Sequence, residues 1–481
     1  MVQQLRERLT LLLIALLPLH AFLVTVGTRL LTGKGHAPLA VLALWKEALL
    51  GVILVLSVME VVRATMEGRR TKDKGQRKGH VFWRVDWIDG LILLLLVLAI
   101  AVTAFAHQDL RLALLGFKYD FIPLIAFVCL RRVAWSAAFQ RMLMRVLLGV
   151  GVIVALYGIL TAFLPIQFFL RLGYGPAHSL YFADGPLAAF QQVSETTLRR
   201  VQGTMSGPNQ LGLWLLVPLG VWLSWLVKGR GILEYWNNRT LGYWMSGVLL
   251  LGALFLTFSR AAWIAAFVIG VVTIIARVPR RAMKNVVVGS VFIVVGIAVI
   301  ATLLFPSVLF RLSSSRGHIT RPLQAMARMV AHPLGEGLGA AGPASNRVSE
   351  TCVFLRPQDD PSWAKSTPTL CVFLGTTQVQ PVDHVCRCPF LPENWYLQVG
   401  VELGILGFVL FIALVVLVLR RLGMQYAVCS MQVCSIAFLS FLGISIAALV
   451  LHAWEDSAVA YTVWLLNAAV LTYRRGRASV G

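Results

Sequence analysis

Long apolar stretches separated by short polar segments dominate this sequence. Each stretch runs for about 17 to 25 residues, the length that a helix needs to cross roughly 30 Å of hydrocarbon. Apolar and polar positions do not alternate within them, so the pattern favours a helical bundle over a β-barrel. We expect twelve spans, at residues 9–31, 38–62, 88–106, 110–130, 146–165, 208–227, 242–258, 261–276, 286–305, 394–419, 429–451 and 457–473. The predicted fold class is an all-α polytopic membrane protein.

Composition agrees with this pattern. The chain has 58% hydrophobic and 13% charged residues, which excludes an ordinary soluble domain. The first apolar stretch follows Arg6 and Arg8 and resembles a signal peptide, but it continues to Leu31 without a small-residue cleavage site. We therefore interpret it as a retained first helix.

The net charge of +22 is explained by membrane topology rather than by nucleic-acid binding. Lys and Arg concentrate on the cytoplasmic side of membrane proteins. With a cytoplasmic N-terminus, the inward loops hold 26 of the 43 Lys and Arg residues. The clearest inward groups are Arg63–Arg84, Arg131–Arg145, Arg277–Lys284 and Arg474–Arg477. This distribution predicts that both termini are cytoplasmic and that residues 306–393 are extracytoplasmic.

The chain therefore divides into three parts: spans one to nine (1–305), a large loop between spans nine and ten (306–393), and spans ten to twelve with the tail (394–481). Within the loop, we expect a helix from Thr320 with one apolar side, suited to the membrane surface. The segment Pro333–Gly339 predicts a flexible turn, and it is not a nucleotide loop because no Lys-Ser/Thr follows it.

Four of the seven cysteines lie in this loop, at positions 352, 371, 386 and 388. An even number on an oxidising face favours two disulfides, with Cys386 and Cys388 bonded to Cys352 and Cys371; a zinc site with His384 is the alternative. Cys129, Cys429 and Cys434 lie in or near spans, and we interpret them as packed thiols.

Two cations, Lys46 and Lys118, fall inside predicted spans, about two turns below the outer surface. A charge there requires a partner or a wet cavity. One interpretation is snorkelling or pairing with Glu47 and Asp120. The other is a substrate-binding cavity open to the outer face.

Two arginines lie near the start of a predicted helix on the predicted outer side of the membrane. Arg200 precedes Gly203, Pro208 and Asn209, a run suited to a tight turn before a helix that Asn209 can cap. Arg260 lies between two spans that have almost no loop between them. A helix N-terminus with a nearby Arg can bind an anion, although anchoring at the interface beside Trp263 would also explain Arg260.

Four short motifs carry a resemblance to a known family. They are Arg200-x-x-Gly-Thr-x-x-x-Pro-Asn-x-Leu-Gly212, Ser259-Arg-Ala-Ala-Trp263, Pro333-Leu-Gly-x-Gly-Leu-Gly339, and Asn394 followed by Gly404-x-x-Gly407. In order and in predicted topology they resemble the O-antigen ligase and O-antigen polymerase superfamily, over about residues 140–420.

The resemblance implies a GT-C-like fold and a metal-independent, inverting glycosyltransferase of the bacterial inner membrane that needs no cofactor. Such enzymes take a glycan from an undecaprenyl diphosphate carrier at the periplasmic face and transfer it to an acceptor hydroxyl. The acceptor is lipid A-core for the ligases of lipopolysaccharide biosynthesis, and another carrier-linked repeat for the polymerases. The partners that the resemblance implies for this protein are these substrates and membrane lipids, not nucleic acid.

The resemblance also implies roles for individual residues. Arg200 and Arg260 match the two arginines that hold the diphosphate, and guanidinium groups suit phosphate oxygens. The ligases usually have His before the Asn of the last motif, where this chain has Glu393. We expect Glu393 to be the general base, with a pKa raised by partial desolvation, and His318 and His384 to be the alternatives.

The remaining candidates would bind the substrates. Asn394 would orient the acceptor, and Arg316 and Arg321 would bind further phosphates or the acceptor. Glu393 is also explained as a first-turn acid that stabilises a helix dipole. Two other classes stay open: a transporter or lipid flippase, for which we find no internal repeat, and a structural scaffold of the cell envelope.

Overall fold

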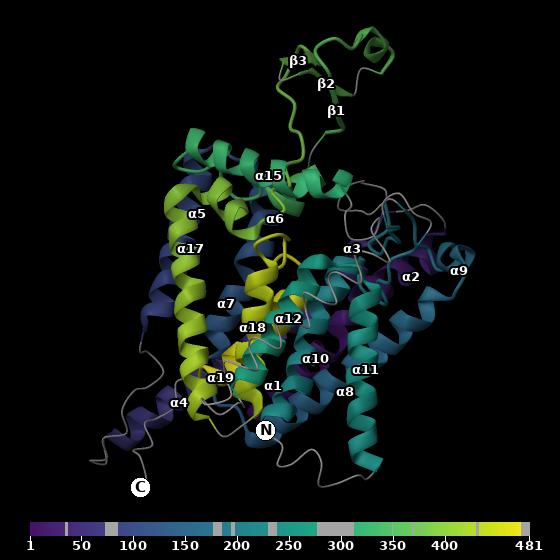
Figure 1. Cartoon of the computed structure of the whole chain (residues 1–481). Helices are drawn as coiled ribbons and strands as arrows, with labels where there is room; N and C mark the ends of the chain where they lie inside the picture. Colours follow the sequence, from purple (N-terminus) through teal and green to yellow (C-terminus); the bar gives the residue numbers. More distant parts are fainter. Residues whose placement is uncertain are drawn as a thin grey trace.

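The computed structural model is a helical bundle with a small sheet at one end (Figure 1). It describes residues 1–472 except for 34–36, 73–84, 177–184, 194–197, 229–237, 277–311, 349, 368–369, 376 and 430–431. The first elements are α1 (Val2–Leu16), η1 (Leu17–Leu19), α2 (His20–Thr32), α3 (Ala40–Ala43), α4 (Trp45–Lys72), α5 (Trp87–Phe105), α6 (Leu110–Asp120), α7 (Ile122–Leu130), α8 (Ala137–Ala162) and α9 (Ile166–Arg171).

The later elements include a long surface helix and three short strands. They are α10 (Pro208–Lys228), α11 (Asn238–Leu256), α12 (Arg260–Ile275), α15 (Leu312–Ala331), α16 (Gly342–Val348), β1 (Cys352–Leu355), η2 (Ser362–Ser366), β2 (Cys371–Leu374), β3 (Thr377–Gln380), α17 (Trp395–Val428), α18 (Gln432–Ala447) and α19 (Ser457–Val470).

Five described helices are long and apolar enough to cross a membrane, or six if α6 and α7, which are bent by 43° relative to each other, form one span. The described part of the chain is therefore that of a membrane protein. The total of twelve spans stays a prediction, and the ninth predicted span, residues 286–305, lies outside the described residues.

Helix α10 lies at the centre of the bundle and packs against α8, α11, α12 and α18. Its residues from Leu211 to Trp222 are buried, which fits a helix that is apolar on all sides. The outer helices instead expose one apolar row each; on α5 the row contains Leu93, Val97 and Ile100. Such rows face lipid in a membrane, because only a surrounding apolar solvent stabilises them.

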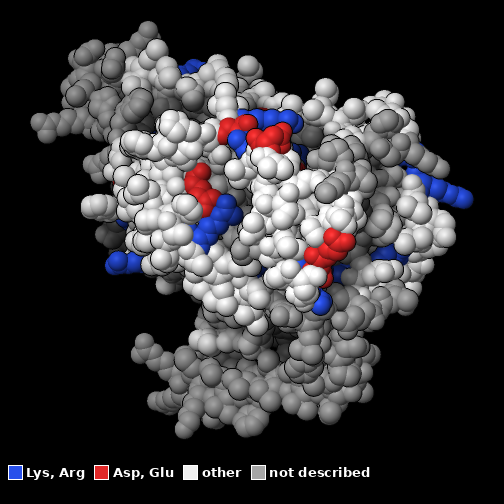
Figure 2. Space-filling model, turned by 90° about the horizontal axis from the view of Figure 1, so that it is seen from above, with Lys and Arg blue, Asp and Glu red and all other residues white. Residues whose placement is uncertain are grey.

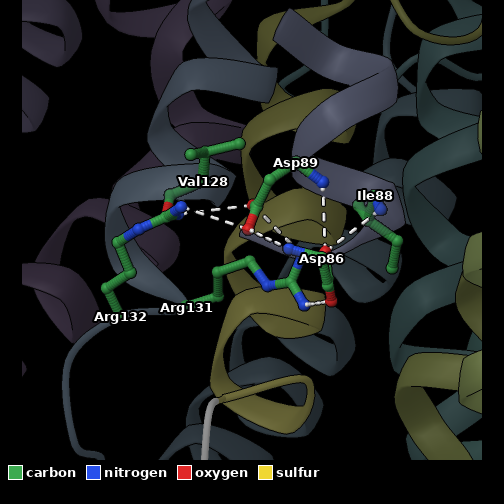
Figure 3. A network of polar contacts seen from close by, with 6 residues as sticks. All are labelled: Asp86, Ile88, Asp89, Val128, Arg131 and Arg132. Carbon is green, nitrogen blue, oxygen red and sulfur yellow. Dashed lines mark hydrogen bonds and ion pairs between the residues drawn. The ribbon is translucent and has the colours of Figure 1, made fainter. Parts of the chain in front are cut away.

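Arginine–aspartate contacts join α5 and α7 at the bundle end where the chain begins (Figure 3). Arg131 donates to Asp86 at 2.7 Å and to Asp89 at 3.3 Å, and Arg132 donates to Asp89 at 3.1 Å. The Asp86 carboxylate also accepts from the amide of Ile88 and so caps α5. We call Asp86, Asp89, Arg131 and Arg132 the α5–α7 clamp.

The first and the last described helices approach the same bundle end. Glu7 of α1 accepts hydrogen bonds from the backbone and side chain of Ser136, which precedes α8. Gln140 of α8 donates to the carbonyl of Ala469 near the end of α19 at 3.5 Å. The sheet lies at the other end of the bundle (Figure 1).

Helix α17 is interrupted at Gly404, whose φ of 72° suits glycine. A Cβ there would lie 2.2 Å from the carbonyl oxygen of Pro333. The turn from Pro333 to Gly339 packs on this break, and Glu402 accepts from the amide of Gly339 at 3.1 Å. The predicted turn is thus present, and α17 supplies hydrogen-bond partners for its backbone.

The loop also departs from the all-α prediction, because it contains a three-stranded sheet in which β1 is parallel and β3 antiparallel to β2. We call residues 350–389 the disulfide lobe. Cys352–Cys388 and Cys371–Cys386 are disulfides, as predicted. The interpretation of Cys429 and Cys434 as thiols is wrong, since they form a third disulfide between α17 and α18.

Charged side chains do not merge into one patch on the face seen in Figure 2. Over the middle of this face, red groups lie beside blue ones in separate clusters, and other blue groups lie apart near its edges. The acidic groups seen on this face are thus accompanied by basic ones.

Candidate functional site

A cavity of about 980 Å³ lies between the first turns of α2, α4 and α19, helix α6 and the segment before α19. Its wall combines apolar side chains with charged ones. The charged lining residues are Lys46, Glu47, Arg111, Lys118, Arg347, Glu455 and Asp456. An amphiphilic anion suits such a cavity, because the apolar wall accepts a hydrocarbon portion while the cations face an acidic one.

The two predicted intramembrane lysines both line this cavity. Glu47 joins them, with its carboxylate 3.0 Å from Lys46 Nζ and 2.8 Å from Lys118 Nζ. Lys46 is only 4% exposed and also contacts His20 Nε2 at 3.1 Å. Pairing with Glu47 and cavity lining, which the sequence presented as alternatives, therefore occur together, whereas no ion pair among the described residues joins Asp120 to either lysine. One carboxylate between two ammonium groups leaves one positive charge at the wall.

Glu393 occupies an unusual backbone position directly before α17. Its φ is 53°, a left-handed value that non-glycine residues seldom adopt. The described residues contain two other such non-glycine positions, His107 and Phe258, and Phe258 precedes Arg260 by two residues. Strain of this kind often marks functional sites.

The carboxylate of Glu393 lies between two side chains of α15. His318 Nδ1 is 2.5 Å from Oε2, and Arg321 pairs with Oε1. Burial raises the pKa of Glu393, but pairing with His318 and the charge of Arg321 outweigh burial and leave this pKa below its usual value. The predicted rise is therefore wrong, and the reason is that the sequence did not show these partners.

A chain of hydrogen bonds links Glu393 to the cavity. Its amide donates to His452 Nε2 at 3.2 Å, and His452 Nδ1 lies 2.7 Å from Gln398 Oε1. Gln398 in turn donates to Glu455 at 2.8 Å. These partners suit a neutral His452 with the proton on Nδ1, and burial lowers the pKa of His452 to about 4. His452, which lines the cavity, thus contacts Glu393 directly, and Leu391, which also lines it, precedes Glu393 by two residues.

Arg200 connects the loop before α10 to the turn between α11 and α12. Its guanidinium donates to Asn209 Oδ1 at 2.7 Å, to the carbonyl of Thr257 at 2.9 Å and to Gln191 Oε1 at 3.4 Å. These three acceptors are neutral. Asn209 lies inside the first turn of α10, so it holds Arg200 instead of capping the helix.

Arg260 is the first residue of α12, as predicted, and is half-buried. Its turn is the one that Arg200 contacts through Thr257. The indole of Trp263 donates to the carbonyl of Leu254 at 2.9 Å and so closes this turn. The two arginines are therefore connected through one short segment.

The predicted site residues form three groups: Arg200 with Asn209 and the Arg260 turn, Glu393 with His318 and Arg321, and Lys46 with Lys118. The wall of the 980 Å³ cavity includes the third group but not Arg200, Arg260 or Glu393 themselves. It does include Ser206 and Gln210, from the segment that follows Arg200.

Three further candidates have other surroundings. Asn394 caps α17, accepting from the amide of Leu397 at 3.0 Å and donating to the carbonyl of Leu449 at 2.8 Å. The side chain of Arg316 lies outside the described residues. His384 lies in the disulfide lobe between Glu350 and Asp383, so it does not join the Glu393 group.

The sequence interpretation missed several residues of this region, above all His452, Gln398, Glu455 and Arg347. The run His452-Ala-Trp-Glu455-Asp456 between two apolar stretches was a usable signal, because polar residues at span ends are costly without a role. Arg347 carried no such signal, since it lies in a polar segment.

No protein-family model matches the chain, and no curated protein matches it.

Proposed function

We propose that the protein is a membrane glycosyltransferase that moves a glycan from an undecaprenyl diphosphate carrier to an acceptor hydroxyl. The observation that carries the proposal is the contact between His318 and a strained Glu393 beside a large amphiphilic cavity. The motif resemblance is the second support.

In the proposed reaction, His318 and Glu393 act as one unit. The Glu393 carboxylate, 2.5 Å from His318 Nδ1, would hold a proton on that nitrogen, which would leave Nε2 to accept the proton of the acceptor hydroxyl. The acceptor oxygen forms a bond to the anomeric carbon while the bond from that carbon to the diphosphate breaks. Attack opposite the leaving group inverts the anomeric centre, and undecaprenyl diphosphate leaves with its negative charge.

That departing charge requires cations placed in advance. Arg200 and Arg260 share one turn and would bind the diphosphate, as the resemblance implies. The paired Lys46 and Lys118 would face an acidic group inside the cavity, with Glu47 limiting the local charge. The apolar part of the wall, including Leu114, suits the hydrocarbon of a lipid substrate.

The proposed location is the bacterial inner membrane, with both termini cytoplasmic and the site on the periplasmic side. The charge distribution between the loops supports it. The shared bundle end of α1 and α19, opposite the sheet, is compatible with it.

The preferred acceptor is lipid A-core, which would make the protein an O-antigen ligase. Polymerisation of carrier-linked repeats is the alternative within the same chemistry. A lipid or solute transporter is the alternative outside it, because a charged cavity between helices also suits a carrier.

Purified protein in nanodiscs, supplied with a lipid-linked glycan and either lipid A-core or a second carrier-linked repeat, tests the proposal. Product is measured by mass spectrometry. His318→Gln and Glu393→Gln are each expected to slow transfer about 10²- to 10⁴-fold, as loss of a general base does. The double variant is expected to be no slower than the worse single one, since the two groups act together.

His332→Gln is the matched control, because His332 is an exposed histidine directly after the same helix. Transfer by His318→Gln at the rate of this control would contradict the assigned chemistry. Absence of transfer to either acceptor by the unaltered protein would favour the transporter.

A further inference from the structure

Helix α15 carries an exposed apolar row along one side. Ile319, Leu323 and Val330 are 63%, 54% and 69% exposed, and Met326 lies between them on the same side. At 3.6 residues per turn, these four positions fall within a sector of about 60°. An apolar row of this regularity is costly in water, so it requires a covering partner.

The opposite side of α15 is already packed against the protein. Ala325 is fully buried, and a Cβ on Gly400 of α17 would meet the Met329 sulfur at 2.5 Å. His318 and Arg321 point from this helix to Glu393. These contacts fix the orientation of α15, and because they lie on its opposite side, the exposed apolar row faces away from the bundle.

The exposed row continues into a row on α17 that faces outward. The Ile405 amide donates to the carbonyl of Pro333, which follows α15, at 3.0 Å. Leu334 is exposed beside this contact, and Ile405, Leu406 and Val409 begin the exposed apolar row of the α17 span. Figure 1 shows α15 lying across the ends of α5 and α17. The exposed apolar residues of α17 are thus joined to those of α15 through Leu334, beside the contact of Ile405 with Pro333.

We infer that α15 is an interfacial helix whose apolar row inserts into the lipid surface, with the acyl chains of the bilayer as its partner. Its arginines fit this placement: Arg321 and Arg328 lie on the side away from the row, and Arg328 pairs with Glu336. Lipid contact then sets the height of His318 and Arg321 relative to the membrane. Only this placement of His318 and Arg321 rests on the proposed function; the inferred contact of α15 with lipid does not depend on that function.

Photolabelling of the full-length protein in vesicles tests this inference. Vesicles of phosphatidylethanolamine and phosphatidylglycerol contain a phospholipid with a diazirine in its acyl chain, and labelled residues are mapped by peptide mass spectrometry. Leu323 and Val330 are expected to be labelled at the level of Leu406, and at least about tenfold above the disulfide lobe. A tenfold ratio of labelling corresponds to about 1.4 kcal/mol, which is less than the free energy gained by burying one such apolar side chain.

Two variants sharpen the test. Leu323→Glu is expected to lower labelling of Val330 about tenfold, because a carboxylate in the row opposes insertion. Gln324→Glu is the matched control: it adds the same charge one residue away, outside the row, and leaves labelling unchanged. Unchanged labelling of Leu406 verifies that each variant is folded.

Labelling of α15 no higher than that of the disulfide lobe would overturn the inference. Equal labelling of Val330 in the two variants would overturn it as well. Neither readout requires glycosyl transfer, so failure of this inference is distinct from failure of the proposed function.

Discussion

Substitution of Arg131 by methionine tests the role of the α5–α7 clamp. Arg131 and Asp89 are each 4% exposed, whereas Arg132 is 19% exposed. Methionine keeps the length and the apolar stem of the side chain but removes the guanidinium. The expected result is a large loss of stability for Arg131→Met and a small one for Arg132→Met.

The size of each stability loss follows from how deeply the side chains are buried and from which ion pairs remain after the substitution. Removing one member of a buried ion pair costs about 3–5 kcal/mol, because the other charge stays buried without its partner. Asp86 is 20% exposed and Arg132 still reaches Asp89, so the lower limit applies, about 3 kcal/mol. Arg132→Met leaves Arg131 in contact with both carboxylates, and about 1 kcal/mol is expected.

Unfolding of the purified protein in mixed micelles, followed by tryptophan fluorescence against denaturant concentration, measures both values. Arg131→Met is expected to shift the midpoint about three times as far as Arg132→Met, with equal slopes. Equal shifts, or a larger shift for Arg132→Met, would refute the reasoning that burial decides the contribution of each arginine.

Three further outcomes are expected. Hydrogen bonds to Glu350 first and Asp383 second raise the pKa of His384. Their stabilisation of the neck of the disulfide lobe, where Glu350 contacts residues 384–387, is therefore complete below pH 6.5 and is lost as pH rises through the raised pKa. The protection of residues 384–387 from hydrogen exchange should fall over this range, and His384→Asn should abolish the pH dependence. Replacing both members of Cys352–Cys388 by serine should increase proteolysis within the lobe and leave the bundle midpoint unchanged, since the bond closes a loop of the lobe alone. The proposed topology places the third disulfide at the cytoplasmic end, where a reducing environment opens such bonds. Cys429 and Cys434 should therefore react with a permeant maleimide in whole cells, and in the oxidised purified protein only after reduction; protection in whole cells would invert the proposed topology.

Helix positions were predictable because the membrane requires a minimum apolar length. The expected span 88–106 corresponds to α5 at Trp87–Phe105, and 457–473 corresponds to α19 at Ser457–Val470. The bend between α6 and α7 could not be predicted, because apolar residues lie on both sides of Asp120 and the run 110–130 therefore resembles one continuous span. The strands of the lobe have four residues each, which is too short for a period of two to be recognised.

Residues of the candidate site could be predicted only where a single residue type was unusual in its place in the sequence. Lys46 and Lys118 stood out because a charge inside a span needs a cause. The partners of Glu393 did not, since Arg321 and His452 are 72 and 59 residues away along the chain. The sign of the Glu393 pKa shift depended on those distant neighbours, so no local pattern could give it.

The neck of the disulfide lobe offers a route for engineering. Cys352 and Cys388 have Cα atoms 5.6 Å apart, so the chain leaves the bundle and returns to it at nearly the same point. Any module whose ends lie at a similar separation could replace the segment between them without pulling on α16 or α17. A rigid fiducial domain grafted there would give this small membrane protein the added mass and asymmetric outline that single-particle imaging needs, while leaving the cavity side chains untouched.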